Sequence, residues 1–252
     1  MMTSISWTRI GVLALLIFVT ISFGILIGLR IPDMNNLVLE GAVNFTAVLA
    51  GALVAFWLQA RREDAKLRAA QLAAVNLMIL GLAGRLGVLS GLKKDLIDPV
   101  RDHEFKQFLL RPAHASWPSY VVDYSALSSL LDKDLAPYVM RIFASDNTYN
   151  LARESVAYHG DLHNQYQTAM DASAFALLES VNDKEIRKII GEKLWTSIEL
   201  SSIGMIDLVD DAHAKILSIL REFPHAFKMS FKESTILCLQ RSDIDQIQIG
   251  HL

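Results

Sequence analysis

An uncharged stretch that runs directly into charged residues places the strongest constraint on this chain. Residues 41–60 (GAVNFTAVLAGALVAFWLQA) carry no charge, and Arg61, Arg62, Glu63 and Asp64 follow at once with no turn residue between. About twenty apolar residues in a helix span the roughly 30 Å hydrocarbon core of a bilayer. The pattern therefore predicts one helix that crosses a membrane and continues unbroken into water.

A second apolar stretch of the same length precedes it. Residues 10–29 (IGVLALLIFVTISFGILIGL) are also uncharged, and residues 31–40 supply turn-forming residues between the two stretches. Backbone polar groups in lipid must be satisfied within the segment itself, so we expect a transmembrane helical hairpin over residues 1–60. A cleaved signal peptide is the alternative for the first stretch, but the apolar run is too long and no small-residue cleavage site follows it.

Basic residues set the expected orientation of the hairpin. They gather after the second stretch, whereas the turn contains only Arg30 and the N-terminus only Arg9. The positive-inside rule then puts the C-terminal part, and with two spans the N-terminus, on the cytoplasmic side of the inner membrane. Anchoring is the expected role of the basic residues, and a lipid-regulated switch is the alternative. The residues expected at the membrane interface are Trp7, Trp57, Arg61, Arg62, Lys66 and Arg68.

Small residues recur at four-residue intervals in both spans, and such rows let helices approach closely in lipid. Packing within one hairpin and assembly of several hairpins into a ring both fit this pattern. Asn44 stands out because an amide at membrane depth needs a partner, which a neighbouring chain can supply. The residues expected in this packing are Gly24, Gly28, Asn44, Ala47, Gly51 and Ala55.

The helix that leaves the membrane is expected to continue to about Leu96, before Asp98 and Pro99. Its apolar residues alternate at three- and four-residue intervals, the spacing of a coiled-coil seam, until Lys93 interrupts the row. A third span or a surface helix over residues 72–92 is the alternative. Arg85 argues against a third span, since a charge in lipid costs at least ~2.5 kcal/mol. The residues expected to pack along this helix are Leu72, Val75, Ile79, Leu82, Leu86 and Leu89.

The rest of the sequence predicts an all-α cytoplasmic domain, a helical bundle or coiled coil over residues 61–224. Pro137 marks a helix start, Gly160 permits a break, and Pro224 is expected to end the last helix. The tail, residues 225–252, has no clear period. The helices expected after the first one cover residues 100–110, 121–131, 135–159, 160–181 and 184–223.

Charge and cysteine content narrow the possible functions. The net charge is −3, and no basic face stands out beyond the membrane junction, so no direct binding to nucleic acid is expected. The single cysteine, Cys238, excludes an internal disulfide and fits a reducing compartment.

The strongest candidate for chemistry is the histidine pair His159 and His163. Two histidines four residues apart on a helix can share a metal ion. However, Gly160 stands where a metalloprotease helix has its glutamate, and no third ligand follows at a recognisable spacing. A polar helix face is the competing interpretation. The candidates for a third ligand through the fold are His103, Glu104 and His114.

A group of aspartates, Asp207, Asp210 and Asp211, precedes His213. We interpret these carboxylates as a solvated acidic face and His213 as a packed histidine, rather than as acid–base machinery. The sequence thus predicts no cofactor and no enzymatic activity.

The overall plan resembles the small bacterial membrane effectors of antiphage systems, including those attached to retrons, which have two N-terminal spans and a helical cytosolic domain. The resemblance rests on the hairpin and on the FWLQARRED junction. It implies an oligomeric inner-membrane protein that depolarises or permeabilises the membrane when a cytosolic partner or trigger releases it. A passive membrane anchor for a cytosolic partner and a membrane-tethered metal-dependent enzyme are the alternatives.

Overall fold

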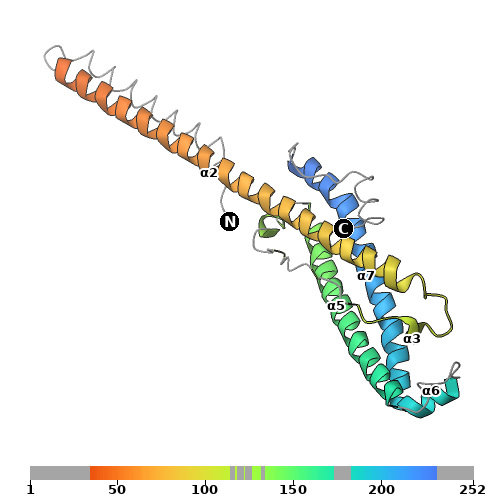
Figure 1. Ribbon diagram of the computed structural model, residues 1–252. Coiled ribbons are helices and arrows are strands. Elements are labelled where there is room, and N and C mark those ends of the chain that lie inside the picture. The colour runs from red at the N-terminus through yellow and green to blue at the C-terminus, as the bar shows by residue number, and fades with distance from the viewer. Residues whose placement is uncertain are drawn as a thin grey trace. The chain divides into compact units, whose positions relative to one another are not determined.

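The computed structural model describes residues 35–113, 117, 122, 127–131, 134–172 and 183–231. All regular elements in these residues are helices and none is a strand, which confirms the all-α prediction (Figure 1). The chain divides into two compact units, Met1–Ala69 and Ala70–Leu252. The predicted first span, over residues 10–29, lies outside the described residues.

The longest element is α2, Asn35–Leu92. It is helical throughout residues 61–70, as predicted, because this stretch consists almost entirely of strong helix formers. It also begins earlier than predicted, since residues 35–40, expected in a turn, are already helical. Val43–Ile97 is long and apolar enough to cross a membrane. The core helix of a soluble protein can have the same length and apolar composition.

A π-helix, η1 (Lys93–Ile97), ends this helical run. The backbone N–H of Asp98 donates to the carbonyl oxygen of Lys93, five residues back, over 2.7 Å. The predicted end at about Leu96 is therefore confirmed. The helix predicted over residues 100–110 is mostly wrong: only α3, Lys106–Leu109, is α-helical, because successive turns with hydrogen bonds between residues three apart occupy the segment around and after Pro99.

Helix α5, Ala136–Asp171, starts with a proline in its first turn, as predicted. It passes through Gly160 without the predicted break. A glycine costs a helix about 1 kcal/mol relative to alanine, and the buried neighbours His159 and Leu162 hold the helix in place on both sides. The helix predicted over residues 121–131 is described only at its end, where Ser128–Leu130 form the 3-10 helix η2.

The last predicted helix is divided into α6, Asp183–Ile190, and α7, Glu192–Phe231. Gly191 separates them: its φ of 81° is left-handed, and its N–H donates to the carbonyl oxygen of Arg187 over 2.9 Å. This is the usual glycine end of a helix. The prediction of one continuous helix is therefore wrong, because it overlooked this glycine.

The expected end of the last helix at Pro224 is also wrong, because α7 continues through it to Phe231. Proline costs a helix interior about 3 kcal/mol. Here the continued helix buries Phe227 beside Phe223, with ring centroids 5.9 Å apart and each residue at most 1% exposed. Burying one phenylalanine contributes roughly 1.5–3 kcal/mol, which offsets most of the cost.

Within the unit Ala70–Leu252, α5 and α7 pack antiparallel, with Arg141 against Glu222 towards one end and His159 against Ser201 towards the other. The C-terminal part of α2 completes the same apolar core. Leu72 is partly buried against this core. The core residues of α2 that are at most 1% exposed are Val75, Met78, Ile79, Leu82, Leu86 and Leu89.

Candidate functional site

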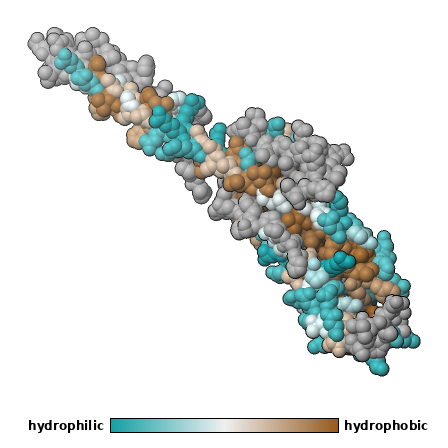
Figure 2. Space-filling model, in the orientation of Figure 1, coloured by the Kyte–Doolittle hydropathy of each residue, from teal (hydrophilic) through white to brown (hydrophobic). Residues whose placement is uncertain are grey.

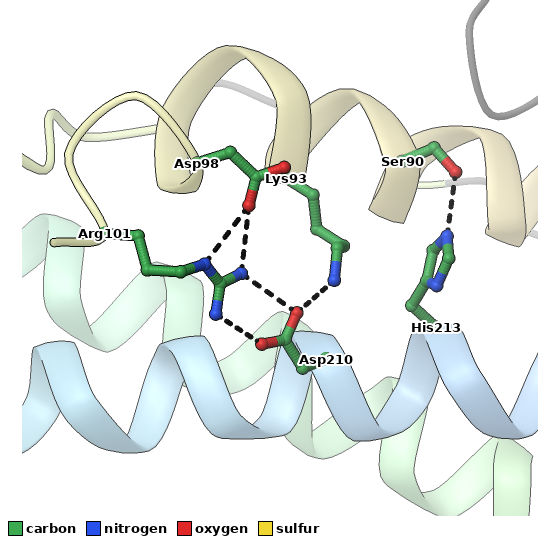
Figure 3. Close-up of polar contacts among 6 residues, drawn as sticks. All are labelled: Ser90, Lys93, Asp98, Arg101, Asp210 and His213. Atoms are coloured by element: carbon green, nitrogen blue, oxygen red, sulfur yellow. Dashed lines mark hydrogen bonds and ion pairs between the residues drawn. The ribbon is translucent and has the colours of Figure 1, made fainter.

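Six polar residues connect the C-terminal end of α2 to α7, and we call them the Asp210 cluster (Figure 3). The Asp210 carboxylate accepts hydrogen bonds from Arg101 at 2.7 and 3.2 Å and also from Lys93 Nζ. Next to this carboxylate, Ser90 Oγ lies 3.2 Å from Nε2 of His213. The cluster consists of Ser90, Lys93, Asp98, Arg101, Asp210 and His213.

The helices fix this geometry. Lys93 is the first residue of η1, and Asp210 and His213 lie one turn apart on α7, so that Lys93 faces Asp210 and Ser90 faces His213. Arg101, from the turns after η1, also binds Asp98, over 3.0 Å from Nη2 and 3.3 Å from Nε. A π turn is often found at functional positions, and here it ends α2 where the chain attaches to α7.

The charges in the cluster balance. Lys93 and Arg101 carry two positive charges, against two negative charges on Asp98 and Asp210. Hydrogen bonds to Asp210 and Asp98 raise the pKa of Arg101 above its ordinary value. Burial raises the pKa of Asp210, but the hydrogen bonds and charges of Arg101 and Lys93 outweigh burial and leave that pKa lowered. The cluster thus joins two helices and holds no excess charge for an ionic ligand.

The expectation that Asp210 belongs to a solvated acidic face is wrong. Its side chain is 32% exposed and carries two ion pairs. Asp207 and Asp211 are exposed, as expected, although Asp211 pairs with Lys215 at 2.6 Å. His213 is half-buried, and burial together with the charge of Lys93 lowers its pKa.

The second candidate site is the pair His159 and His163, whose stacked rings lie 6.4 Å apart between centroids. His159 Nδ1 is 3.0 Å from Oγ of Ser201, and its Nε2 is 3.3 Å from the carbonyl oxygen of Leu110. His163 Nε2 lies 3.3 Å from the amide nitrogen of Gln167. The two histidines are 1% and 4% exposed, so the interpretation as a polar helix face is wrong.

Burial dominates the acid–base behaviour of this pair. It lowers the pKa of both histidines, and the charge of His163 lowers that of His159 further, whereas the hydrogen bond to Leu110 raises it. Aromatic rings complete the surroundings: Phe108 lies 4.9 Å from Tyr166 and 4.8 Å from Trp195 between centroids. Both histidines are therefore favoured in the neutral form.

The described residues around the histidine pair supply no third ligand for a metal ion. Among the described residues, no group of three His, Cys, Asp or Glu side chains lies close enough to hold a metal ion. His103 and Glu104 are exposed, and His114 lies outside the described residues.

A buried ion pair accounts for the charge inside the apolar part of α2. Arg85, 3% exposed, binds Asp146 of α5 through Nη1, and its guanidinium lies 4.5 Å from the ring centroid of Tyr149. These contacts argue against a third span over residues 72–92, because the domain core buries one side of this stretch and Asp146 neutralises Arg85.

The predicted membrane residues that are described lie in the N-terminal part of α2. The small-residue row Asn44, Ala47, Gly51 and Ala55 is exposed, and Trp57 is 39% exposed. The basic residues Arg61, Arg62, Lys66 and Arg68 are exposed as well. Trp7, Gly24 and Gly28 lie outside the described residues.

The sequence interpretation missed the partners of Lys93 and Arg85. One signal was available: a charged residue that interrupts an apolar row at a core position requires an opposite charge. The choice of Asp210 and Asp146 as those partners depends on how the helices pack, which no spacing in the sequence reveals.

Comparison of the chain with protein-family models, with curated proteins and with solved structures finds no match. The class defined by the structure is therefore a broad one: an all-helical protein with a long apolar helix that could associate with a membrane.

Proposed function

We propose that this protein is an oligomeric inner-membrane protein whose cytoplasmic helical domain senses a trigger and whose membrane helices then depolarise or permeabilise the bilayer, as in phage defence. The observation that carries the proposal is the exposure of apolar side chains along residues 43–60. Figure 2 shows apolar side chains along this part of α2, followed by a hydrophilic patch. The large apolar residues exposed there by 36–72% are Val43, Phe45, Val48, Leu53, Val54, Phe56, Trp57 and Leu58.

Lipid is the environment that fits such a surface. Monomeric soluble proteins rarely expose long contiguous apolar surfaces, and this one includes no charged residue between positions 43 and 60. The basic residues that follow support a cytoplasmic domain by the positive-inside rule. With the predicted span over residues 10–29, the N-terminus also lies in the cytoplasm.

The helix α2 supplies the proposed route from trigger to membrane. The buried side of its stretch between residues 75 and 92 belongs to the domain core, and its residues between 43 and 60 carry the exposed apolar surface. A trigger that repacks the core, or breaks the Asp210 cluster at the end of α2, thus acts on the helix that enters the bilayer. Asn44 and the small-residue row support close contacts between several chains in lipid.

The test is induced expression in bacteria, with and without phage infection, followed with a dye that reports membrane potential and by growth. We expect depolarisation and growth arrest by the native chain. The matched control replaces residues 1–60 with an unrelated two-span hairpin and is expressed to the same level in the membrane fraction. If this control leaves the membrane potential unchanged, the result supports a membrane-perturbing effector.

Two other outcomes contradict the proposal. Unchanged potential and growth with the native chain under both conditions exclude a membrane-perturbing effector. Equal biological activity of the native and hairpin-replaced chains, such as equal protection from phage, identifies a passive anchor for a cytosolic partner instead.

A further inference from the structure

Four basic side chains follow the apolar surface of α2 within eight residues. Arg61, Arg62, Lys66 and Arg68 are all exposed, and none lies within ion-pair distance of a carboxylate among the described residues. By contrast, Arg101, Arg141, Arg187 and Lys215 in the domain each bind an acidic side chain. The four cations next to the apolar surface are thus available for an external anion.

The basic and the acidic side chains of this segment lie on different sides of the helix. Successive residues of an α-helix are about 100° apart, so the four basic residues fall within an arc of about 160°. Glu63 and Asp64 lie on the remaining side of the helix. Glu63 also accepts a hydrogen bond from the Gln59 side chain at 3.0 Å. One side of the segment is therefore basic without interruption, and we call it the basic side of α2.

Trp57 marks where the basic side meets the apolar surface. The Arg61 guanidinium lies 4.5 Å from the centroid of the Trp57 ring, one turn earlier. Tryptophan favours the boundary between the hydrocarbon and the headgroups. A stacked arginine retains N–H donors at its edge, which can bind phosphate oxygens in pairs.

The length of the segment matches the region where lipid charge acts. With a rise of 1.5 Å per residue, Arg68 lies about 10 Å beyond Arg61 along α2. The headgroup layer on one side of a bilayer is about 5–7 Å thick, and the field of anionic lipids extends about 8–10 Å further at physiological salt. All four basic residues thus act within reach of the same leaflet.

We infer that the basic side of α2 binds the phosphates of anionic phospholipids in the cytoplasmic leaflet, so that the protein selects these lipids over zwitterionic ones. The inference rests on the membrane placement under the proposed function and adds a ligand class to it. Free inorganic phosphate offers the same chemistry. A lipid surface, however, presents many phosphates in one plane next to the apolar stretch, which matches four cations in one arc.

The experiment reconstitutes the full-length chain in phosphatidylcholine vesicles that contain trace spin-labelled phosphatidylglycerol or spin-labelled phosphatidylcholine. Electron paramagnetic resonance then measures the association of each lipid with the protein. We expect a several-fold preference for phosphatidylglycerol in the native chain, since a single basic residue near the surface contributes about a fivefold effect. Added salt should reduce it.

The test variant replaces all four residues by glutamine (Arg61→Gln, Arg62→Gln, Lys66→Gln, Arg68→Gln), which preserves helix propensity. We expect its preference to fall to that for phosphatidylcholine. The matched control makes the same change at four exposed lysines of the domain and should retain the preference. The control positions are Lys184, Lys188, Lys193 and Lys228. An Arg→Lys variant at positions 61, 62 and 68 keeps the charge and should retain most of the preference.

Three outcomes overturn the inference: no preference in the native chain, an unchanged preference in the glutamine variant, or an equal loss in the lysine control. Loss of the preference on adding inorganic phosphate at matched ionic strength identifies a free-phosphate site and also overturns it. The proposed function fails separately, when alkaline carbonate extracts the native chain from membranes. A chain that resists extraction without selecting lipids contradicts this inference alone.

Discussion

The two ends of α2 have similar composition and opposite surroundings. Between residues 43 and 60, apolar side chains such as Val48 and Phe56 are exposed by 71% and 72%. Between residues 75 and 92, Leu82 and Leu86 are completely buried in the domain core, together with the ion-paired Arg85. Hydropathy alone does not distinguish the two stretches. Their charge content does distinguish them: residues 43–60 carry no charge, whereas Arg85 lies in the buried stretch, where a carboxylate of another helix pairs with it.

The first prediction makes the same chemical change at both ends. Leu82→Asp puts an unpaired carboxylate into a filled core, so we expect the domain to lose more than ~4 kcal/mol of stability. Leu53→Asp should leave the domain's melting temperature unchanged but cost about 3 kcal/mol of membrane insertion. Circular dichroism melts in detergent and carbonate extraction measure the two effects. Equal effects of both variants on domain melting would remove the distinction between the two stretches.

The second prediction concerns acid, to which the helical domain should respond and residues 43–60 should not. Burial lowers the pKa of His159 and His163 in the folded domain, whereas an unfolded histidine titrates near 6.5. As the pH falls, protons therefore bind the unfolded chain first. The two histidines should not reduce the stability of the domain above about pH 6.5, and the stability should decrease below this pH. The total loss for each histidine is about 1.4 kcal/mol for every unit by which folding lowers its pKa.

Thermal melts at several pH values measure this effect. The variants His159→Gln and His163→Gln should have a shallower decrease between pH 6.5 and 5 than the native chain, and the exposed His225→Gln should match the native chain. Residues 43–60 contain no titratable side chain, so resistance to carbonate extraction should not change after incubation at these pH values. Parallel pH profiles for all variants would assign the acid sensitivity to other groups.

The smallest predicted effect lies where α2 ends. Asp210→Asn removes the charge that Lys93 and Arg101 share. Because the Asp210 side chain is about one-third exposed, water screens part of this interaction. We expect a loss of about 1 kcal/mol, which lowers the melting temperature by roughly 2–4 °C. The exposed Asp207→Asn should stay within about 0.5 kcal/mol. An effect that does not diminish at high salt would contradict the ion-pair explanation.

The sequence predicted correctly those features that depend on local chemistry. The helix through residues 61–70 follows from its helix-forming residues, and the end of the run follows from Pro99. The boundary at Gly191 could also have been predicted, because Arg187 and Lys188 precede the glycine as basic residues do in a last helical turn.

The errors occurred where tertiary packing outweighs local preference. Gly160 stays helical between buried neighbours, and Pro224 stays helical because Phe227 is buried beyond it. The partners of Asp210 and the burial of the histidine pair depend on the contacts of α7 with η1 and α5, which are distant in sequence. Spacing along one helix carries no information about them.

The segment of α2 over residues 61–70 has a consequence for how the protein can vary. All its side chains are exposed, so neither a core nor, in the proposed membrane arrangement, hydrocarbon supports the helix there. Away from the basic side, many substitutions should be neutral as long as the new residue has a high helix propensity. A glycine weakens the segment by about 1 kcal/mol and a proline by about 3 kcal/mol. Natural variants of this segment should therefore differ widely in side-chain size but should rarely contain glycine or proline.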